Sequence, residues 1–339
     1  MLRYEIKSDL LSIPLEDWNN LLSDSITATV FQTPEYCQAW WNVFVHDDKQ
    51  LCLVVIYDEK EIIGIAPLRR QNDKITFLGT DSVGKGQDLV TDFGDIVAKK
   101  GREKEIWKQV VGAIREMRVV REVVLDYVRE SSQSFSVLKE SGHQISEMID
   151  NANSDVAPYL FLPKTWDEYL AQLGRKERHE LRRKLRRLEG VGYEIDSFPI
   201  GQLNYSYRHS EVVKEFIRLH KLSTREKDLF MTSLMETFFT KLSEVFTPQG
   251  LLEFSFLKIG GENVASTISF LWKNEFWLYN SGFDRKYDNL AIGFLLKALT
   301  IKMAIEKGFA RYSFLRGNER YKYDLGAKDE KLYKIIIKP

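Results

Sequence analysis

The chain has 339 residues, enough for two ordinary domains, and 44% of its side chains are apolar while 29% are charged, as in globular proteins with a buried core. Its 49 basic and 49 acidic side chains cancel, which excludes an overall field that would draw the protein to nucleic acid or to a membrane. No run approaches the roughly 18 apolar residues of a membrane span, and the N-terminal stretch lacks the apolar core of a signal peptide, so we expect a cytoplasmic protein.

The first half alternates helix and strand patterns. Thr33 followed by Pro34 indicates a helix start, because threonine caps free N–H groups and proline fits the first helical position. The expected elements are a helix from 34, strands 51–57, 61–68 and 74–79, a loop TDSVGKGQD (80–88), a helix 102–117, a strand 121–128, a helix 131–141 and a strand 143–149. The polar stretch DNANSD then predicts a domain boundary near 150–165.

The second half begins with a helix that Thr165 caps, with Glu168 at the spacing of a capping box. The elements expected after it are a helix 176–189, a strand YEIDSF (193–198), helices at about 207–223 and 230–246, strands 251–259, 264–272 and 275–282, a helix from about 290 to 307, and strands 311–315 and 332–338. The two halves share one order of elements, so the sequence predicts an internal duplication of an α/β unit, with mixed sheets flanked by helices.

Neither the cysteines nor the histidines form a metal-binding pattern. Cys37 and Cys52 lie in apolar surroundings, as buried free thiols do, and the five histidines are scattered. The sequence therefore predicts neither a disulfide nor a metal site.

The stretch LYNSGFDRKYDNLAIGFLLK (278–297) joins an aromatic strand to a helix through a charged loop. The first turn of a helix carries unpaired N–H groups and a partial positive charge, which suits a pyrophosphate. Gly293 would let phosphates approach the backbone closely. The alternative is ordinary packing of a strand against a helix that contains one glycine.

This stretch and its continuation resemble the C-terminal signature of the CelD-like branch of the GNAT acyltransferase superfamily, which is related to FemAB-type aminoacyltransferases. The matching positions are Tyr279, Gly282, Asp284, Gly317, Glu319, Tyr321 and Lys322. FQTPEYCQAWW, IIGIAPL, ITFLG and the pattern Trp-x-x-Tyr-Leu-x-x-Leu before a Lys/Arg helix match as well, so the resemblance covers nearly the whole chain. Two positions depart from it: Ile292 stands where the family has proline, and Ser313 where an acidic residue is often found.

The resemblance implies two tandem GNAT-like domains. The first, 1–155, would be degenerate and without cofactor, and the second, 156–339, would be the acyltransferase domain and include the basic helix 175–189. The implied enzyme moves an acyl group from acyl-coenzyme A, foremost acetyl-coenzyme A, to an amine or hydroxyl acceptor and needs no metal.

The resemblance also implies site residues. Those for the cofactor are Asn280, Ser281, Gly282, Ala291, Ile292, Gly293 and Phe294, the first three polarising the thioester carbonyl and the others holding the pyrophosphate. Those for the substrate are Tyr279, Arg316 and Lys322.

Three further residues are candidates for proton transfer. Asp284 or Glu319 would accept the proton of the attacking group, and Tyr321 would protonate the leaving thiolate. The alternatives are that the carboxylates are surface groups paired with Arg285, Arg316 or Lys322, and that Tyr321 is a core aromatic. Lys322 could bind an anionic substrate or pair with Glu319.

The segment RKERHELRRKLRRLE (175–189) holds eight Lys/Arg and three Glu, with leucines 181, 185 and 188 on one face. The first interpretation is a helix packed by this apolar face with its charges in solvent. The others are a patch for an anionic acceptor or carrier, or for tRNA, which FemAB-type relatives use. No aromatic residue interleaves with these arginines, which disfavours stacking of single-stranded bases.

Three functions follow as alternatives. The first is an acyl-coenzyme A transferase acting on a sugar or polysaccharide precursor, as CelD-like relatives are associated with cellulose and exopolysaccharide production. The second is a FemAB-like aminoacyltransferase that uses charged tRNA, and the third is a non-catalytic scaffold. The loop 80–88 either helps to shape the acceptor cleft or binds a phosphate-bearing ligand, although it lacks the P-loop spacing. The acceptor, the acyl chain length and the oligomeric state stay open.

Overall fold

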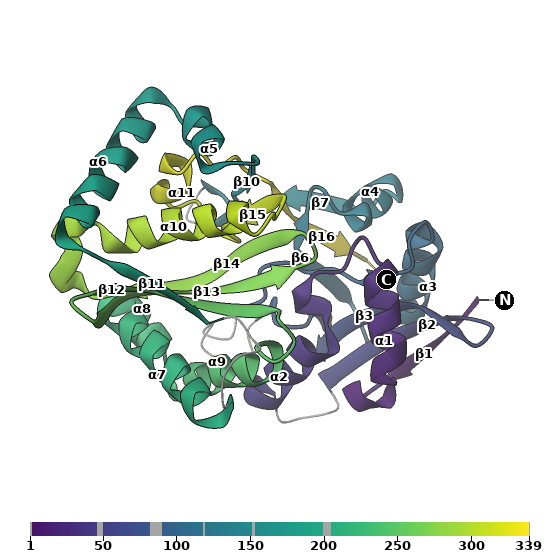
Figure 1. Cartoon of the computed structure of the whole chain (residues 1–339). Coiled ribbons are helices and arrows are strands. Elements are labelled where there is room, and N and C mark those ends of the chain that lie inside the picture. Colours follow the sequence, from purple (N-terminus) through teal and green to yellow (C-terminus); the bar gives the residue numbers. More distant parts are fainter. Residues whose placement is uncertain are drawn as a thin grey trace. The chain divides into compact units, whose positions relative to one another are not determined.

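The computed structural model describes residues 2–45, 50–81, 90–117, 119–150, 153–198 and 205–338 (Figure 1). The glycines of the loop 80–88 lie outside these residues. The chain divides into an N-terminal unit, Met1–Val156 with Glu330–Pro339, and a C-terminal unit, Ala157–Asp329. The last ten residues, which we expected in the C-terminal domain, cluster with the N-terminal unit because their strand pairs with two strands of its sheet.

The N-terminal unit is a mixed sheet with helices against it. Its elements are β1 (Leu2–Lys7), η1 (Leu10–Ser12), α1 (Leu15–Asp24), η2 (Val30–Gln32), α2 (Pro34–Phe44), β2 (Leu51–Asp58), β3 (Glu61–Gln71), β4 (Lys74–Phe77), β5 (Val97–Ala98), α3 (Glu103–Glu116), β6 (Glu122–Arg129), α4 (Gln133–Glu140), β7 (Gln144–Glu147), β8 (Ile149–Asp150), β9 (Asn153–Ser154) and β16 (Leu332–Ile337). The sheet order is β1-β2-β3-β4-β6-β16-β7, with β5 on β3, while β8 pairs with β9. Cys37 and Cys52 are buried free thiols, as expected.

The C-terminal unit is a six-stranded sheet between two groups of helices. Its elements are β10 (Tyr159–Phe161), α5 (Trp166–Gln172), α6 (Arg175–Val191), β11 (Glu194–Phe198), α7 (Tyr205–Ser223), α8 (Arg225–Phe230), α9 (Ser233–Phe246), β12 (Leu252–Ile259), β13 (Glu262–Trp272), β14 (Glu275–Phe283), η4 (Arg285–Leu290), α10 (Ile292–Glu306), β15 (Arg311–Ser313) and α11 (Arg320–Asp324). The sheet order is β10-β15-β14-β13-β12-β11. Figure 1 shows α5, α6, α10 and α11 on one face and α7, α8 and α9 on the other.

The predicted duplication is present in the pairing of the strands. In each unit an antiparallel meander (β2-β3-β4 or β12-β13-β14) is followed by a crossover helix (α3 or α10) and a strand parallel to the third strand. Each first hairpin carries one bulge, which leaves Ile63 in one unit and Val264 in the other without a partner in the register. The α/β class with mixed sheets flanked by helices is thus confirmed.

The helix starts that the sequence predicts are also observed. The Thr33 hydroxyl accepts from the Tyr36 N–H at 3.2 Å, and the Thr165 hydroxyl accepts from the Glu168 N–H at 3.2 Å. The Glu168 carboxylate accepts from the Lys164 N–H. In a capping box it would accept from the N–H of the cap residue itself, Thr165. The helix expected at 230–246 begins only at Ser233, because Thr224 and Thr232 each cap a helix and the short α8 lies between them.

Candidate active site

The candidate site lies where β15 stops pairing with β14. The two parallel strands pair only at Glu275 with Arg311, Phe276 with Tyr312 and Trp277 with Ser313. Beyond Trp277, the described part of the chain gives β14 one strand partner, β13, instead of two. The backbone of this strand end can therefore meet side chains or a ligand, and it carries Asn280, Ser281 and Gly282.

Helices α7 and α8 supply two such side chains. The Lys227 ammonium on α8 donates to the carbonyl of Ser281, and the Ser223 hydroxyl at the end of α7 accepts from the Phe283 N–H at 2.8 Å. Both contacts lie in the part of β14 that β15 has left. Helices α7 and α8 thus hold this strand end in place.

Gly282 is required by the packing of α7 on the sheet. A Cβ at this position would lie 2.3 Å from the His220 nitrogen and 2.4 Å from the Leu219 carbonyl carbon. These are backbone atoms of α7, which cannot move aside as a side chain can. Close helix packing therefore explains the glycine, and its predicted contact with the cofactor stays a prediction.

Asn280 lies beside a buried histidine of α7. His220 is 1% exposed, and burial, followed by the nearby Lys227 charge, lowers its pKa to about 3, so the imidazole is neutral at physiological pH. The Asn280 side chain hydrogen-bonds the imidazole ring of His220. We find no hydrogen-bond partner for the Nδ1 atom of His220 in the described chain.

Tyr279 is the bulged residue of β14. Ile268 pairs with Asn280 and Ser269 pairs with Leu278, so Tyr279 is the extra residue that the bulge inserts. Its ring packs on Phe239 of α9 at 6.0 Å and on Phe270 at 5.0 Å between ring centres. The structure thus places Tyr279, a predicted substrate residue, in an aromatic cluster with α9.

Helix α10 begins without a side-chain cap. Ala291 has φ 55° and ψ 37°, a left-handed conformation in which the chain turns sharply into the helix. The N–H groups of Phe294 and Leu295 bond to the Ala291 carbonyl, whereas the described residues offer no acceptor to the N–H groups of Ile292 and Gly293. The first turn also has no acidic residue. It therefore keeps the free donors that a phosphate needs.

The side chains of this turn face the protein. Ile292 is fully buried in the core, and the Phe294 ring lies under the Lys184 ammonium of α6, 4.5 Å from it. A Cβ on Gly293 would come within 2.6 Å of the Phe283 ring. Any ligand at the start of α10 would therefore meet its backbone.

Asp284 has a structural task at the end of β14. Its carboxylate accepts from the Lys286 N–H at 2.9 Å and so caps η4. This contact is a backbone cap on a half-buried residue, and the catalytic role of Asp284 stays a prediction.

Lys322 lies buried inside the turn between β15 and α11. Its ammonium donates to the carbonyls of Leu315 at 3.3 Å and of Arg316 and Gly317 at 2.9 Å, and it pairs with the Glu319 carboxylate at 2.9 Å. These four acceptors outnumber the three N–H donors of an ammonium group, so none of its donors is left over. The structure thus favours pairing with Glu319 over binding of an anionic substrate.

The same turn carries the other residues that the sequence predicted here. The Glu319 side chain is 58% exposed, and the Arg316 side chain is half-buried. Burial, followed by the Glu319 charge, raises the pKa of Tyr321 well above its usual value, so its phenol stays protonated at neutral pH. Ser313 is buried, and its hydroxyl accepts from the Leu315 N–H at 3.1 Å, which stabilises the turn.

Two lysines that the sequence analysis missed lie in this site. Lys297 on α10 is 7% exposed, donates to the Gly293 carbonyl at 2.9 Å and lies 4.7 Å from the centre of the Tyr321 ring. Burial, then repulsion from Lys227 and Lys322, lowers the pKa of Lys297 to about 7, although Glu319 opposes this. Burial also lowers the pKa of Lys227 to about 8. The Glu319 carboxylate thus pairs with Lys322, and its charge also acts on Lys227 and Lys297.

Only one of the two lysines left a signal in the sequence. Lys297 is the only charged residue of the run IGFLLKALTI, and such a residue on an apolar helix must find a partner or a function. Lys227 stands in the charged segment TREKD, where nothing sets it apart.

The basic helix α6 packs as the first interpretation predicts. Leu181 and Leu188 are buried in the core, and Leu185 packs against it. Several of the basic side chains stay exposed and line a shallow hollow with Glu180; those exposed there are Arg175, Lys176, Arg182 and Arg186. The helix thus combines a structural face with a positively charged outer face.

Two observations concern the described chain as a whole. We find no group of three or more His, Cys, Asp or Glu side chains placed to hold a metal ion in the ranges given above. Among the helices of those ranges, none is long and apolar enough to cross a membrane.

Comparison with known families identifies the domain that holds the site. Residues 175–323 match the model of the acetyltransferase (GNAT) domain, and these residues lie within the C-terminal unit. No curated protein matches the chain.

Solved structures show the same fold over nearly the whole chain. FemX has a TM-score of 0.64 at 12% identity, with 95% of this chain and 96% of FemX covered. L-PGS from Bacillus licheniformis has a TM-score of 0.60 at 10% identity, with 94% and 90% covered. A tandem GNAT protein from the clavulanic acid biosynthesis pathway has a TM-score of 0.50 at 10% identity, with 100% and 98% covered. The fold is thus that of tandem GNAT-like domains, and the CelD-like branch stays a prediction.

Proposed function

We propose that this chain, an enzyme with a GNAT-type acetyltransferase domain, transfers an acyl group from acyl-coenzyme A to an amine or hydroxyl acceptor. The observation that carries the proposal is the start of α10. Its two free N–H groups, its lack of acidic residues and its place after the strand end of β14 suit the pyrophosphate of coenzyme A. The matched domain spans both elements.

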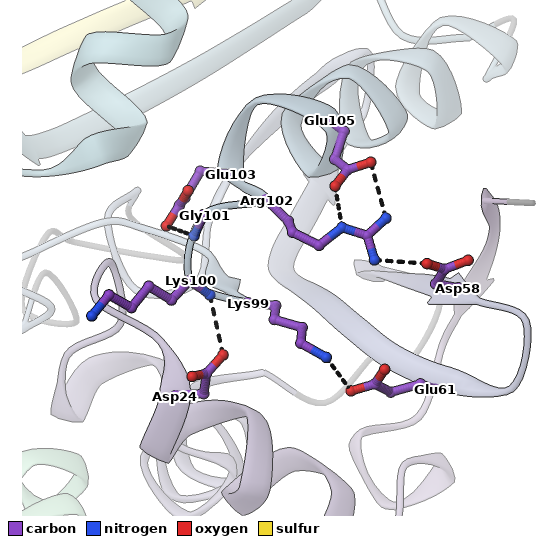
Figure 2. A network of polar contacts seen from close by, with 9 residues as sticks. All are labelled: Asp24, Asp58, Glu61, Lys99, Lys100, Gly101, Arg102, Glu103 and Glu105. Carbon is purple, nitrogen blue, oxygen red and sulfur yellow. Dashed lines mark hydrogen bonds and ion pairs between the residues drawn. The ribbon is translucent and has the colours of Figure 1, made fainter.

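The equivalent helix start in the N-terminal unit supports a single cofactor site. The first turn of α3 carries Glu103 and Glu105, and the Glu103 carboxylate accepts from the Gly101 N–H at 3.1 Å. The Lys100 N–H is bound by Asp24 at 3.2 Å, and Arg102 is paired with Glu105, as Figure 2 shows. Carboxylates at this position would repel a phosphate. We therefore propose that the N-terminal unit is a degenerate copy without cofactor.

The transfer needs two bonds and one proton to change. The acceptor nitrogen or oxygen forms a bond to the acyl carbon, the carbon–sulfur bond breaks, and the proton of the acceptor leaves while the thiolate gains one. Of the strand-end residues Asn280 to Gly282, Ser281 would supply the N–H that polarises the thioester carbonyl, once the acyl oxygen displaces the Asn280 side-chain oxygen to which this N–H donates at 2.8 Å. Tyr321, which stays protonated, would donate to the thiolate.

We assign the proton acceptor to Glu319, because Asp284 already caps η4 while Glu319 faces the buried amines and is partly exposed. Glu319→Gln is expected to lower kcat by about 100-fold, since general-base catalysis contributes about this factor or more. Steady-state kinetics with acetyl-coenzyme A would measure it, with the exposed Glu306→Gln on α10 as matched control. A kcat within a few-fold of wild type would remove Glu319 as the base, and the same measurement on Asp284→Asn would then test the other carboxylate.

Binding of the acyl donor is the most direct test of the proposed function. Acetyl-coenzyme A at about 100 times its Kd should stabilise the protein by about 2.7 kcal/mol, seen as a rise in Tm. Coenzyme A itself should produce a similar rise, because the pyrophosphate is common to both. If neither ligand, nor a longer acyl-coenzyme A, shifts Tm at millimolar concentration, the proposal fails.

For the acceptor we propose a sugar or polysaccharide precursor. The sequence resemblance to the CelD-like branch supports it, since those relatives are associated with cellulose and exopolysaccharide production.

A second candidate is aminoacyl transfer from charged tRNA. The likeness to FemX and L-PGS and the exposed basic side chains of α6 favour it. Titration with tRNA at increasing salt tests it, because a contact through several phosphates weakens steeply with salt. Weak binding that does not respond to salt would remove this candidate, and a chain that binds neither donor would be a scaffold.

A further inference from the structure

The three lysines near Glu319 differ in how many of their ammonium N–H groups find a hydrogen-bond acceptor in the protein. An ammonium has three N–H donors. Lys322 has three carbonyl acceptors and the Glu319 carboxylate, whereas Lys227 and Lys297 each have a single acceptor in the described chain, a backbone carbonyl. Most of the N–H donors of these two amines therefore have no hydrogen-bond acceptor in the described chain, although Lys297 is buried and Lys227 is half-buried.

The charges around these two amines do not balance. Three amines, those of Lys227, Lys297 and Lys322, stand against one carboxylate, that of Glu319, which is already paired with Lys322 at 2.9 Å. The other titratable neighbours are neutral, since Tyr321 is protonated and His220 is uncharged. A buried ammonium without an anion is strongly unfavourable. Another anion would therefore be stabilised strongly here.

The two amines also lie at the two elements of the proposed donor site. Lys227 is bonded to the Ser281 carbonyl in the part of β14 that β15 has left, and Lys297 is bonded to the Gly293 carbonyl in the first turn of α10. They come from different helices, α8 and α10, yet the charge of Glu319 raises the pKa of each. An anion held between them would thus lie next to the strand end and the helix start.

We propose that Lys227 and Lys297 form a binding site for an anionic oxygen group, a phosphate or a carboxylate, that a substrate carries beside the reacting centre. The inference rests on the proposed function for its location, and it adds a substrate class: one of the two substrates must present such a group at this point. Lys322 takes part only as a fixed neighbouring charge, because its donors are already used.

The test is isothermal titration of the full chain at pH 8 and constant ionic strength, with inorganic phosphate and acetate as probes. Because the pKa of Lys297 is about 7 and that of Lys227 about 8, an anion between them should bind with uptake of about one proton. Proton uptake is measured by repeating the titration in two buffers that differ in ionisation enthalpy. Tighter binding of phosphate would assign a phosphate-bearing substrate, and tighter binding of acetate a carboxylate-bearing one.

Lys227→Met and Lys297→Met should each weaken this binding by about tenfold or more, because a charge-assisted contact is lost. Lys302→Met, at an exposed position of α10, is the matched control and should bind as wild type does. Equal affinity in wild type and both variants, binding without proton uptake, or no binding of either probe at about 50 mM, each overturns the inference. The proton uptake of the wild type decides the matter even where a variant does not fold.

Failure of the inference can be told apart from failure of the proposed function. Protein that consumes acetyl-coenzyme A, while Lys297→Met leaves the phosphate and acetate titrations unchanged, keeps the function and loses the anion site. Protein that binds phosphate with proton uptake, but never binds acetyl-coenzyme A, keeps the anion site and loses the function.

Discussion

Gly282→Val is expected to destabilise the C-terminal unit by more than about 4 kcal/mol, a loss large enough to unfold it under many conditions. A β-carbon at this position would lie 2.3 to 2.5 Å from backbone atoms of Leu219 and His220, far inside contact distance. Relief requires α7 to lift from β14, and this movement would also displace Ser223 from the Phe283 N–H. Urea unfolding of the full chain, together with hydrogen exchange of the β14 amides, measures the effect.

Two other glycines of the unit serve as controls. Gly293→Ala should be tolerated better, because the nearest atoms belong to the Phe283 ring, which can shift. Gly190→Ala should raise stability by up to about 1 kcal/mol, since Gly190 lies in α6, has nothing near its missing β-carbon, and alanine is the better helix former. If Gly282→Val were as stable as Gly190→Ala, the described packing of α7 on β14 would be wrong.

The free energy of unfolding is expected to rise between about pH 7 and pH 10 through Lys227 and Lys297. In the folded protein their pKa values are about 8 and about 7, whereas an unfolded lysine has a pKa of about 10.4. Across this window the unfolded chain holds protons that the folded chain has released, so higher pH favours the folded state. Each lysine contributes a slope of up to about 1.4 kcal/mol per pH unit.

Urea unfolding at intervals from pH 6 to pH 10 measures this dependence as the difference between wild type and the double variant Lys227→Met/Lys297→Met. The variant should be the more stable at pH 6, because it buries no unpaired ammonium, and its advantage should shrink as the pH rises. Parallel curves for the two proteins would show that neither pKa is lowered by folding. Such a result would also remove the charge imbalance from which the anion site is inferred.

Much of the architecture follows from local patterns. The alternation of apolar residues and the capping residues Thr33 and Thr165 predict helices and strands that the structure contains, because a cap needs only its own turn. Local patterns miss α8, since six residues of charged sequence carry no periodicity, and they place β16 in the wrong unit, since strand pairing joins distant segments.

The candidate site is less predictable for the same reason. The predicted segments, the end of β14, the start of α10 and the turn before α11, each carry a suitable group. However, the sequence could not tell that Gly282 faces α7, that Asp284 caps η4, or that Lys322 is enclosed by carbonyls. These outcomes depend on neighbours from other elements. The roles predicted for the site residues stay predictions until substrate binding is measured.

By itself, the sequence determined the order of the elements, the duplication and the resemblance to acyltransferases. The spacing of apolar residues, the helix caps and the motifs each depend only on residues close together in the chain. Only the tertiary structure decided which charges meet. Lys227 and Lys297 are 70 positions apart in the numbering; Lys297 lies on α10, and Lys227 reaches the end of β14 because α7 packs on Gly282 and α8 follows α7. Burial lowers the pKa of both amines, repulsion from Lys227 and Lys322 lowers that of Lys297 further, and no local sequence pattern encodes these effects.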